Sequence, residues 1–398
     1  MKNPWRGLKE IPRNIWMLAI ATFINRAGMM VLPFIALYSV EVLKVSVAES
    51  GMVIASFGIG ALLSAPFVGK LSDKIGSLRL MEISLLSSGI FLFFYSIVSD
   101  FTTFLILSFF WAIISESFRP ASMSFISSEI SSDRRKTAFA LNRLAINLGM
   151  SIGPVAGGIL STINFSLLFY FDGGTSIAAG LFLIYSRMIK RQKENLVAEE
   201  TSDSVLIPGL KILSNKKFLF FLLALVPVDI VFFQHIGALP LFVVDGLGFT
   251  KSIFGIVMGI NTVMVILIEV PLNDAMRNWQ NWKSMSLGSV LAAIGFGILV
   301  FTTEIHLLIL SVVVWTFGEM ILFPSAGDYV AEISPPDKRG EYMGYFQMTF
   351  STSLIIGPLL GTKVLGDFGS EILWTGTFAF GLISALMMLK LKGQKKIL

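Results

Sequence analysis

The hydrophobic pattern of the chain is a series of long apolar runs separated by short polar segments. A helix that rises about 1.5 Å per residue needs roughly 20 apolar residues to cross a bilayer. Spans are therefore predicted at 14–41, 49–69, 78–98, 102–128, 136–160, 165–187, 217–244, 252–272, 283–303, 305–330, 340–363 and 371–390. The predicted fold class is an all-α integral membrane protein with twelve transmembrane helices.

Composition supports a membrane location. Of the 398 residues, 54% are hydrophobic and 14% are charged, and the mean hydropathy is +0.77. A soluble protein could not cover such a surface with polar atoms. The chain has no cysteine, so disulfides and thiolate metal sites are excluded, and its two isolated histidines give no metal-ligand spacing. We therefore expect a multi-pass protein of the lipid bilayer with no metal site.

Positive charge is distributed unevenly between the two sets of loops. Alternate segments hold 26 of the 31 lysines and arginines, whereas the remaining loops hold only Lys44, Lys251 and Lys363. The positive-inside rule places both termini in the cytoplasm, and a bacterial inner membrane is the expected location. No short apolar stretch with a cleavage site follows the basic N-terminus, so we expect the first helix to be retained.

The two halves of the sequence repeat each other. One offset of 204 residues relates Trp111 to Trp315, Pro120 to Pro324, Asp133 to Asp337, Arg135 to Arg339, Gly153-Pro154 to Gly357-Pro358, and Gly157 to Gly361. A fixed spacing at several separate places predicts two homologous six-helix bundles with a cavity between them at the midplane. We expect bundles at 1–187 and 217–398, joined by a polar cytoplasmic linker at 188–216.

The turn between the second and third spans has a distinctive pattern, Gly69-Lys-Leu-Ser-Asp73-Lys74-Ile-Gly76-Ser-Leu-Arg79. It resembles motif A of the major facilitator superfamily of transporters. The resemblance implies that Asp73 caps the helix of the eleventh span when the cavity opens outward, and that Arg79 reaches an acid at the end of the fourth span, where Glu129 is the nearest. The gating residues implied here are Gly69, Asp73, Lys74, Gly76, Arg79 and Glu129.

The fifth span carries a small-residue pattern, Gly149-x-x-x-Gly153-Pro154-x-x-Gly157-Gly158. Small residues let helices approach closely, and a proline bends its helix. The pattern resembles motif C, which is typical of the drug/proton antiporter branch of the superfamily. Gly153, Pro154, Gly157 and Gly158 are accordingly further gating candidates.

Ionisable and polar groups inside predicted spans are candidates for substrate or proton binding, because burying them is costly. These candidates are Asn25, Arg26, Glu116, Arg119, Asp229, Gln234, His235 and Glu319. Glu116 and Arg119 are three residues apart and can pair on one helix face, which could also be structural. Arg119 can extend toward the interface, His235 can be an ordinary satisfied polar residue, and Asp172 can serve either local hydrogen bonding or proton transport.

The resemblance implies a secondary active transporter, not an enzyme, that works by rocker-switch alternating access. We expect proton-coupled efflux of a small amphipathic solute, with the proton as coupling ion and no cofactor. Proton-coupled uptake of a peptide-like solute, or translocation of a lipid or lysolipid, is the alternative. Transport by a monomer is expected, with no nucleic-acid partner.

Overall fold

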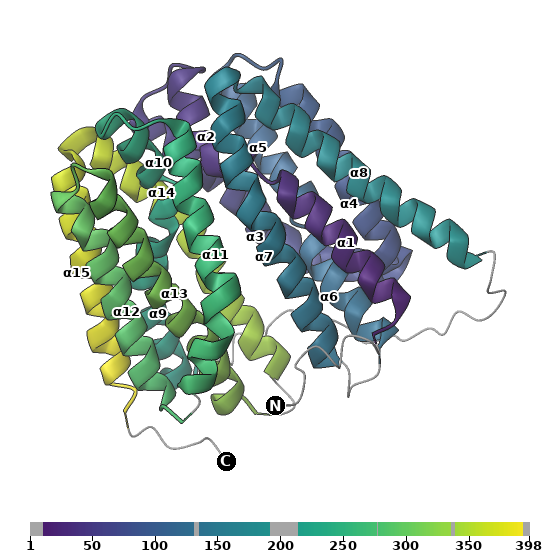
Figure 1. Ribbon diagram of the computed structural model, residues 1–398. Coiled ribbons are helices and arrows are strands. Elements are labelled where there is room, and N and C mark those ends of the chain that lie inside the picture. The colour runs from purple at the N-terminus through teal and green to yellow at the C-terminus, as the bar shows by residue number, and fades with distance from the viewer. Residues whose placement is uncertain (1–10, 131–134, 192–213, 277, 336–338, 393–398) are drawn as a thin grey trace. The chain divides into compact units, whose positions relative to one another are not determined.

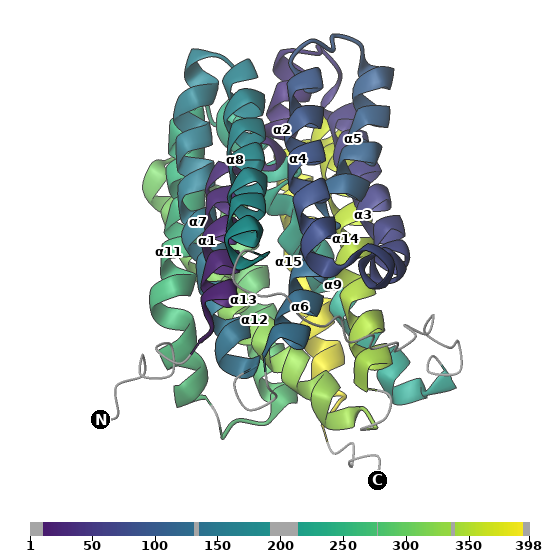
Figure 2. The ribbon, with the colours of Figure 1, turned by 90° about the vertical axis from the view of Figure 1, so that its right-hand side faces the viewer.

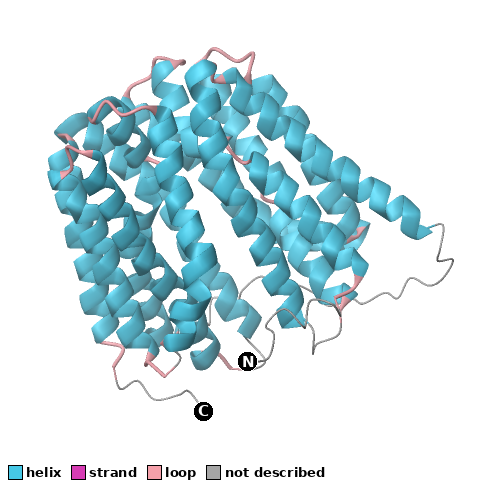
Figure 3. Cartoon of the chain, in the orientation of Figure 1, coloured by secondary structure: helices cyan, strands magenta, loops and turns pink. Residues whose placement is uncertain are grey.

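The computed structural model of the protein describes residues 11–130, 135–191, 214–276, 278–335 and 339–392. Every regular element among them is helical (Figure 3). Twelve helical stretches in these ranges are long and apolar enough to cross a membrane, from Arg13–Glu41 to Ser370–Leu389. The predicted fold class is confirmed. The expected linker at 188–216 lies largely outside the described residues.

Packing divides the chain into two compact units. The first unit comprises Met1–Val31 with Gly60–Val205, and the second comprises Leu32–Ile59 with Leu206–Leu398. The helix α3 (Val47–Ile75) therefore contributes its first half to the second unit and its remainder to the first. The division into 1–187 and 217–398, which came from the sequence repeat, stays a prediction.

The first unit is built from helices that pack around one apolar core. Its elements are α1 (Arg13–Gly28), the second half of α3, α4 (Ser77–Tyr95), α5 (Phe101–Ser115), α6 (Phe118–Glu129), α7 (Arg135–Ile163) and α8 (Ser166–Arg191). Helix α1 lies between α7 and α8, and α8 also packs along α4 (Figure 2). Ile15, Leu18, Met81 and Phe118 are among the buried side chains of this core.

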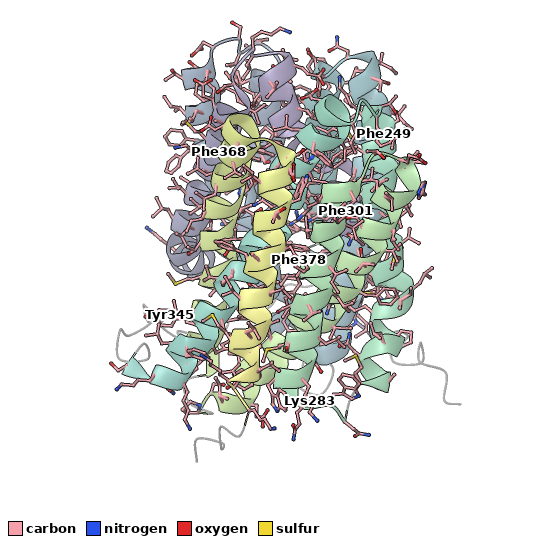
Figure 4. All side chains as sticks on the ribbon, turned by 90° about the vertical axis from the view of Figure 1, so that its left-hand side faces the viewer. Phe249, Lys283, Phe301, Tyr345, Phe368 and Phe378 are labelled. Carbon is pink, nitrogen blue, oxygen red and sulfur yellow. The ribbon has the colours of Figure 1, made fainter. Side chains whose placement is uncertain are left out.

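The second unit has a more aromatic core. Its elements are α2 (Val31–Glu41), the first half of α3, α9 (Lys216–Phe232), η3 (Phe233–His235), α10 (Ala238–Leu241), η4 (Phe242–Gly246), α11 (Lys251–Ala275), α12 (Asn281–Ile298), η5 (Leu299–Phe301), α13 (Ile305–Ile333), α14 (Arg339–Phe368) and α15 (Ser370–Leu389). Phe218 and Phe221 of α9 pack against Tyr342 and Tyr329. Phe301 and Phe368 instead project from the surface, as expected of lipid-facing residues (Figure 4).

Within the described residues three spans are broken, which corrects the expectation of twelve continuous helices. The first span breaks between α1 and α2, the fourth between α5 and α6, and the seventh at η3 (Figure 1). Met29 in the first break and Phe233 in the third differ by 204, so the repeat relates these two breaks. Polar backbone groups freed at such breaks need partners inside the protein, which makes each break a place to look for function.

Candidate functional site

The break in the first span is held by an acidic side chain from α8. The backbone N–H groups of Met30 and Val31 both donate to Oδ2 of Asp172, at 3.2 Å each. Asp172 is buried and caps the start of α2, where unpaired N–H groups favour a carboxylate. Gly28 permits this contact, because a Cβ there would overlap the side chain of Thr175. The local hydrogen-bonding role of Asp172 is thus present in the structure.

Arg26 lies just before this break and has more donors than acceptors around it. Its Nη1 donates to Sδ of Met29 at 2.9 Å, and its buried Nε has no partner among the described residues. A thioether is a weak acceptor. Arg26 feels attraction from Glu116 and Asp172 and repulsion from Arg119. The guanidinium therefore keeps hydrogen-bonding capacity for a further anionic or carbonyl group.

The other candidate residues of the first unit, Asn25, Glu116 and Arg119, have different surroundings from Arg26. Nδ2 of Asn25 donates to Oγ of Ser176 at 3.1 Å, which ties α1 to α8. Glu116 and Arg119 form no ion pair, contrary to the expectation that they share one helix face. The reason is that α5 ends at Ser115 and α6 starts at Phe118, so the two residues flank a break, and Arg119 is exposed.

The small residues of α7 bring its backbone against the end of α1. A Cβ at Gly153 would lie 2.7 Å from the carbonyl oxygen of Met29, and one at Gly149 would lie 2.5 Å from Cβ of Arg26. Pro154, Gly157 and Gly158 are buried on the same helix. The motif C-like pattern thus fixes α7 beside the charged turn of α1.

In the second unit, the matching position holds a carboxylate without a partner. Asp229 has 0% exposure, and neither of its carboxylate oxygens accepts a hydrogen bond from a described residue. The hydroxyl of Thr349 on α14 lies beside it but donates to the carbonyl oxygen of Phe346 at 2.8 Å. Asp229 and Asn25 differ by 204, so the repeat places an acid where the first unit has an amide.

Gln234 and His235 lie in the break of the seventh span. Nε2 of Gln234 donates to the carbonyl oxygens of Ile230 and Gly357, at 3.0 and 2.8 Å. Nδ1 of His235 lies 2.6 Å from the carbonyl oxygen of Phe232, so this nitrogen carries the proton. The imidazole packs against Trp315 and Phe232. Both side chains therefore stabilise the break.

Glu319 on α13 has a partner that the sequence did not indicate. Nδ2 of Asn261 on α11 donates to Oε2 of Glu319 at 2.8 Å and approaches Oγ1 of Thr316 at 3.0 Å. Asn261 and Thr262 are polar residues within the otherwise apolar stretch 253–268 of α11, and that interruption was the available signal. No described group of three His, Cys, Asp or Glu residues has the arrangement of a metal site.

The repeat extends to side-chain packing. A Cβ at Gly357 would lie 3.0 Å from the carbonyl oxygen of Ile230 and 3.2 Å from Cβ of Phe233. Gly153 contacts the corresponding residues Arg26 and Met29 in the first unit. Each unit therefore sets a Gly-Pro helix against the end of a broken span.

A family model described as the Major Facilitator Superfamily matches residues 18–358, with a further match at 281–394. The chain belongs to this superfamily. Membership makes it a multi-pass membrane transporter and not an enzyme, with a small molecule as its substrate.

Relatives within the superfamily differ in what they carry. The chain is 25% identical over 324 residues to Multidrug resistance protein 1 of Bacillus subtilis, covering 80% of this chain and 81% of the relative. It is 24% identical over 390 residues to a Na(+), Li(+), K(+)/H(+) antiporter of Planococcus maritimus, covering 90% and 91%. The solved nucleoside transporter NupG has the same fold, with a TM-score of 0.79 at 17% identity and coverage of 96% and 100%.

The motif A turn of this transporter joins α3 to α4. Gly76 has φ of 88°, a conformation that side chains disfavour. Glu129, at the end of α6, accepts a hydrogen bond from Asn14 of α1, and Lys74 and Arg79 are exposed. Gly69 and the side chain of Asp73 lie outside the described part of the structure. The gating roles of these residues stay predictions.

Two ion pairs of the transporter were not predicted from the sequence. Nη1 of Arg187 on α8 lies 3.1 Å from Oε2 of the buried Glu82 on α4. Nζ of Lys251, at the start of α11, lies 2.6 Å from Oε2 of Glu41 at the end of α2. Each pair joins residues far apart in sequence at the ends of different spans, and no local pattern identifies such partners.

Proposed function

We propose that the protein is a proton-coupled exporter of small amphipathic organic solutes. The superfamily relatives named for multidrug resistance and for cation/proton antiport support efflux and proton coupling. The uneven distribution of lysine and arginine supports cytoplasmic termini. The bacterial relatives support placement in a bacterial inner membrane.

The observation that carries this proposal is the charged network at the broken first span. Arg26, Glu116 and Asp172 interact electrostatically inside the membrane-spanning part of the first unit. Charges at this depth are costly and mark ion or substrate paths. Asp172 is occupied with the backbone of α2, whereas Arg26 retains an unpaired Nε. Arg26 and Glu116 are thus the members of the network that are free to exchange partners.

The proposed coupling is a competition for this polar network. A carboxylate near a guanidinium favours its ionised form, and it binds a proton more readily once the guanidinium turns to another group. Solute binding at Arg26 therefore changes the proton affinity of Glu116. Alternating access exposes the network to one side of the membrane and then to the other, which links solute movement to the pH gradient.

The test is gradient-driven flux in proteoliposomes that contain the full chain. An acidic lumen should drive accumulation of norfloxacin, an amphipathic solute whose carboxylate and ketone can accept hydrogen bonds from Arg26. Dipeptides and a fluorescent lysolipid, tested in the same assay, should not accumulate. Glu116→Gln should reduce this flux at least tenfold. Glu304→Gln is the matched control, because the carboxylate of Glu304 is exposed and pairs with the exposed His306 at the start of α13.

The direction of the gradient separates the candidate functions. Accumulation that requires an acidic exterior, with a dipeptide as the accumulated solute, would establish proton-coupled uptake instead. Flux of every probe that ignores both the gradient and Glu116→Gln would refute proton coupling.

A further inference from the structure

Membrane-embedded carboxylates of this protein differ in what neutralises them. Glu319 accepts a hydrogen bond from Asn261. Glu116 and Asp172 are attracted to Arg26, and Asp172 also accepts two backbone N–H groups. Asp229 is fully buried and accepts no hydrogen bond from a described residue, since the adjacent hydroxyl of Thr349 donates to the carbonyl oxygen of Phe346. Of these four acids, it alone lacks compensation for a negative charge.

An ionised carboxylate in that setting would be strongly destabilising, because an unpaired charge in an apolar interior costs many kcal/mol. The neutral, protonated form avoids this cost. We propose that Asp229 binds a coupling proton in the second unit, in addition to the proton-linked Glu116 of the first unit. This inference rests on the proposed proton coupling and names a second group that takes part in it.

The elements around Asp229 contain no charge that could replace the proton. Helix α9 packs against α12, α14 and α15, and the stretches 284–298, 349–362 and 372–389 of these helices contain no ionisable residue. The ionisable residues of α12, α14 and α15 lie outside these stretches, and α13 carries Glu319 and Tyr329. His235 follows on the same span, with Nδ1 directed to the carbonyl oxygen of Phe232.

Two hydroxyl groups of α14 provide a means of release. Thr349 and Ser353 are four residues apart, so they lie on one helix face. Thr349 lies beside Asp229, and Gly357 contacts Ile230 and Phe233, so the register places Ser353 between these contacts. The buried Oγ of Ser353 has no partner, and the hydroxyl of Thr349 donates to its own helix. Both hydroxyls can rotate toward Asp229.

Release of the proton from Asp229 is a single proton transfer. The carboxylic O–H bond of Asp229 breaks, the proton passes to a water molecule, and the carboxylate accepts hydrogen bonds from the two hydroxyls. Hydrogen bonds to an ionised group favour that form. Protonation is thereby linked to the packing of α14 on α9, where Pro358 and Pro227 interrupt the backbone hydrogen bonding of each helix.

The test is infrared difference spectroscopy of the full chain in nanodiscs during a pH titration without solute. The wild type should show the C=O band of a protonated carboxylic acid that disappears with rising pH. Asp229→Asn should remove this band, whereas Glu319→Gln should keep it. Thr349→Val and Ser353→Ala should each move its midpoint about one unit to higher pH, since a hydrogen bond to a charge contributes about 1.5–3 kcal/mol and one unit corresponds to about 1.4 kcal/mol.

Controls keep the test decisive. Thr349→Ser should restore the wild-type midpoint, and Ser384→Ala should leave it unchanged, because Ser384 is a buried hydroxyl that donates to Ala224 elsewhere on α9. A titrating band that persists in Asp229→Asn would overturn the inference while leaving proton coupling intact. Loss of the band on replacing choline with Na⁺ at constant pH would overturn it in favour of a sodium site.

Discussion

The contact between α7 and α1 gives a prediction whose size follows from atomic distances. In Gly153→Ala, the new Cβ would lie 2.7 Å from the carbonyl oxygen of Met29 and 3.3 Å from that of Arg26. The nearer atom belongs to the backbone at the break, so it cannot move aside as a flexible side chain can. Overpacking of this kind costs about 1–3 kcal/mol. The gain in helix propensity from glycine to alanine offsets about 1 kcal/mol.

We therefore expect Gly153→Ala to destabilise the protein by up to about 2 kcal/mol after this offset. Gly357→Ala should cost less, because its nearest backbone contact, the carbonyl oxygen of Ile230, is at 3.0 Å. Gly174→Ala in α8 is the matched control, since a Cβ there meets no atom within 4 Å. The control should be neutral or slightly stabilising.

The assay is heating followed by size-exclusion chromatography of the detergent-purified protein. Thiol-reactive dyes cannot report unfolding, because the chain has no cysteine. A change of 1 kcal/mol corresponds to about 2–4 °C for a domain of about 200 residues. The expected order of stability is Gly174→Ala, then Gly357→Ala, then Gly153→Ala. If Gly153→Ala is as stable as Gly174→Ala, then α7 does not restrain the break through this contact.

Two further substitutions test pairs that the structure defines. Trp111→Phe should cost about 0.5–1.5 kcal/mol more than Trp315→Phe, because Nε1 of Trp111 donates to Ser88 at 3.0 Å and that of Trp315 has no partner; equal losses in thermal unfolding would contradict this. Arg187→Met should destabilise by about 1–3 kcal/mol, as it leaves the buried Glu82 without its partner while Arg187 itself is 27% exposed. The double variant Glu82→Leu/Arg187→Met should recover most of that loss, and additive losses would show that the two side chains are not coupled.

The ends of the spans could be predicted from the sequence because hydrophobic length sets them. The predicted 217–244 and 371–390 correspond to Lys216–Gly246 and Ser370–Leu389. The breaks could not be predicted in the same way. Pro33 cannot donate a helical hydrogen bond to the carbonyl oxygen of Met29, which favours a bend there. The group that stabilises the break is Asp172, about 140 residues further along the chain, and no local pattern indicates it. Such a break is a tertiary feature that hydropathy does not record.

The polar residues of the candidate site could be recognised in the sequence, but the side chains that they contact could not. Arg26, Glu116, Asp229 and Glu319 were recognisable because each is a polar residue within an apolar run. Sequence spacing also allowed Glu116 and Arg119 to pair, which the break between α5 and α6 prevents. Which acid has a donor and which has none depends on contacts between helices, as the bond from Asn261 to Glu319 illustrates. Those contacts decide the chemistry of the site.

The repeat clarifies why the two units have different chemical roles. At equivalent positions, the first unit has Asn25 and Arg26, whereas the second has Asp229 and Ile230. The backbone design is shared, since Gly153 and Gly357 contact equivalent residues at each break. In the first unit, Arg26 has unpaired hydrogen-bonding capacity near Glu116 and Asp172. In the second unit, Asp229 is an acid without a cation beside it. A shared bend with opposite charge suits the first unit to partner exchange at Arg26 and the second to carrying a proton. Conversion of Ile230 to a cation would place a permanent positive charge one residue after Asp229, which favours the ionised carboxylate, and Ile230→Arg should remove the infrared band of protonated Asp229 in the same titration.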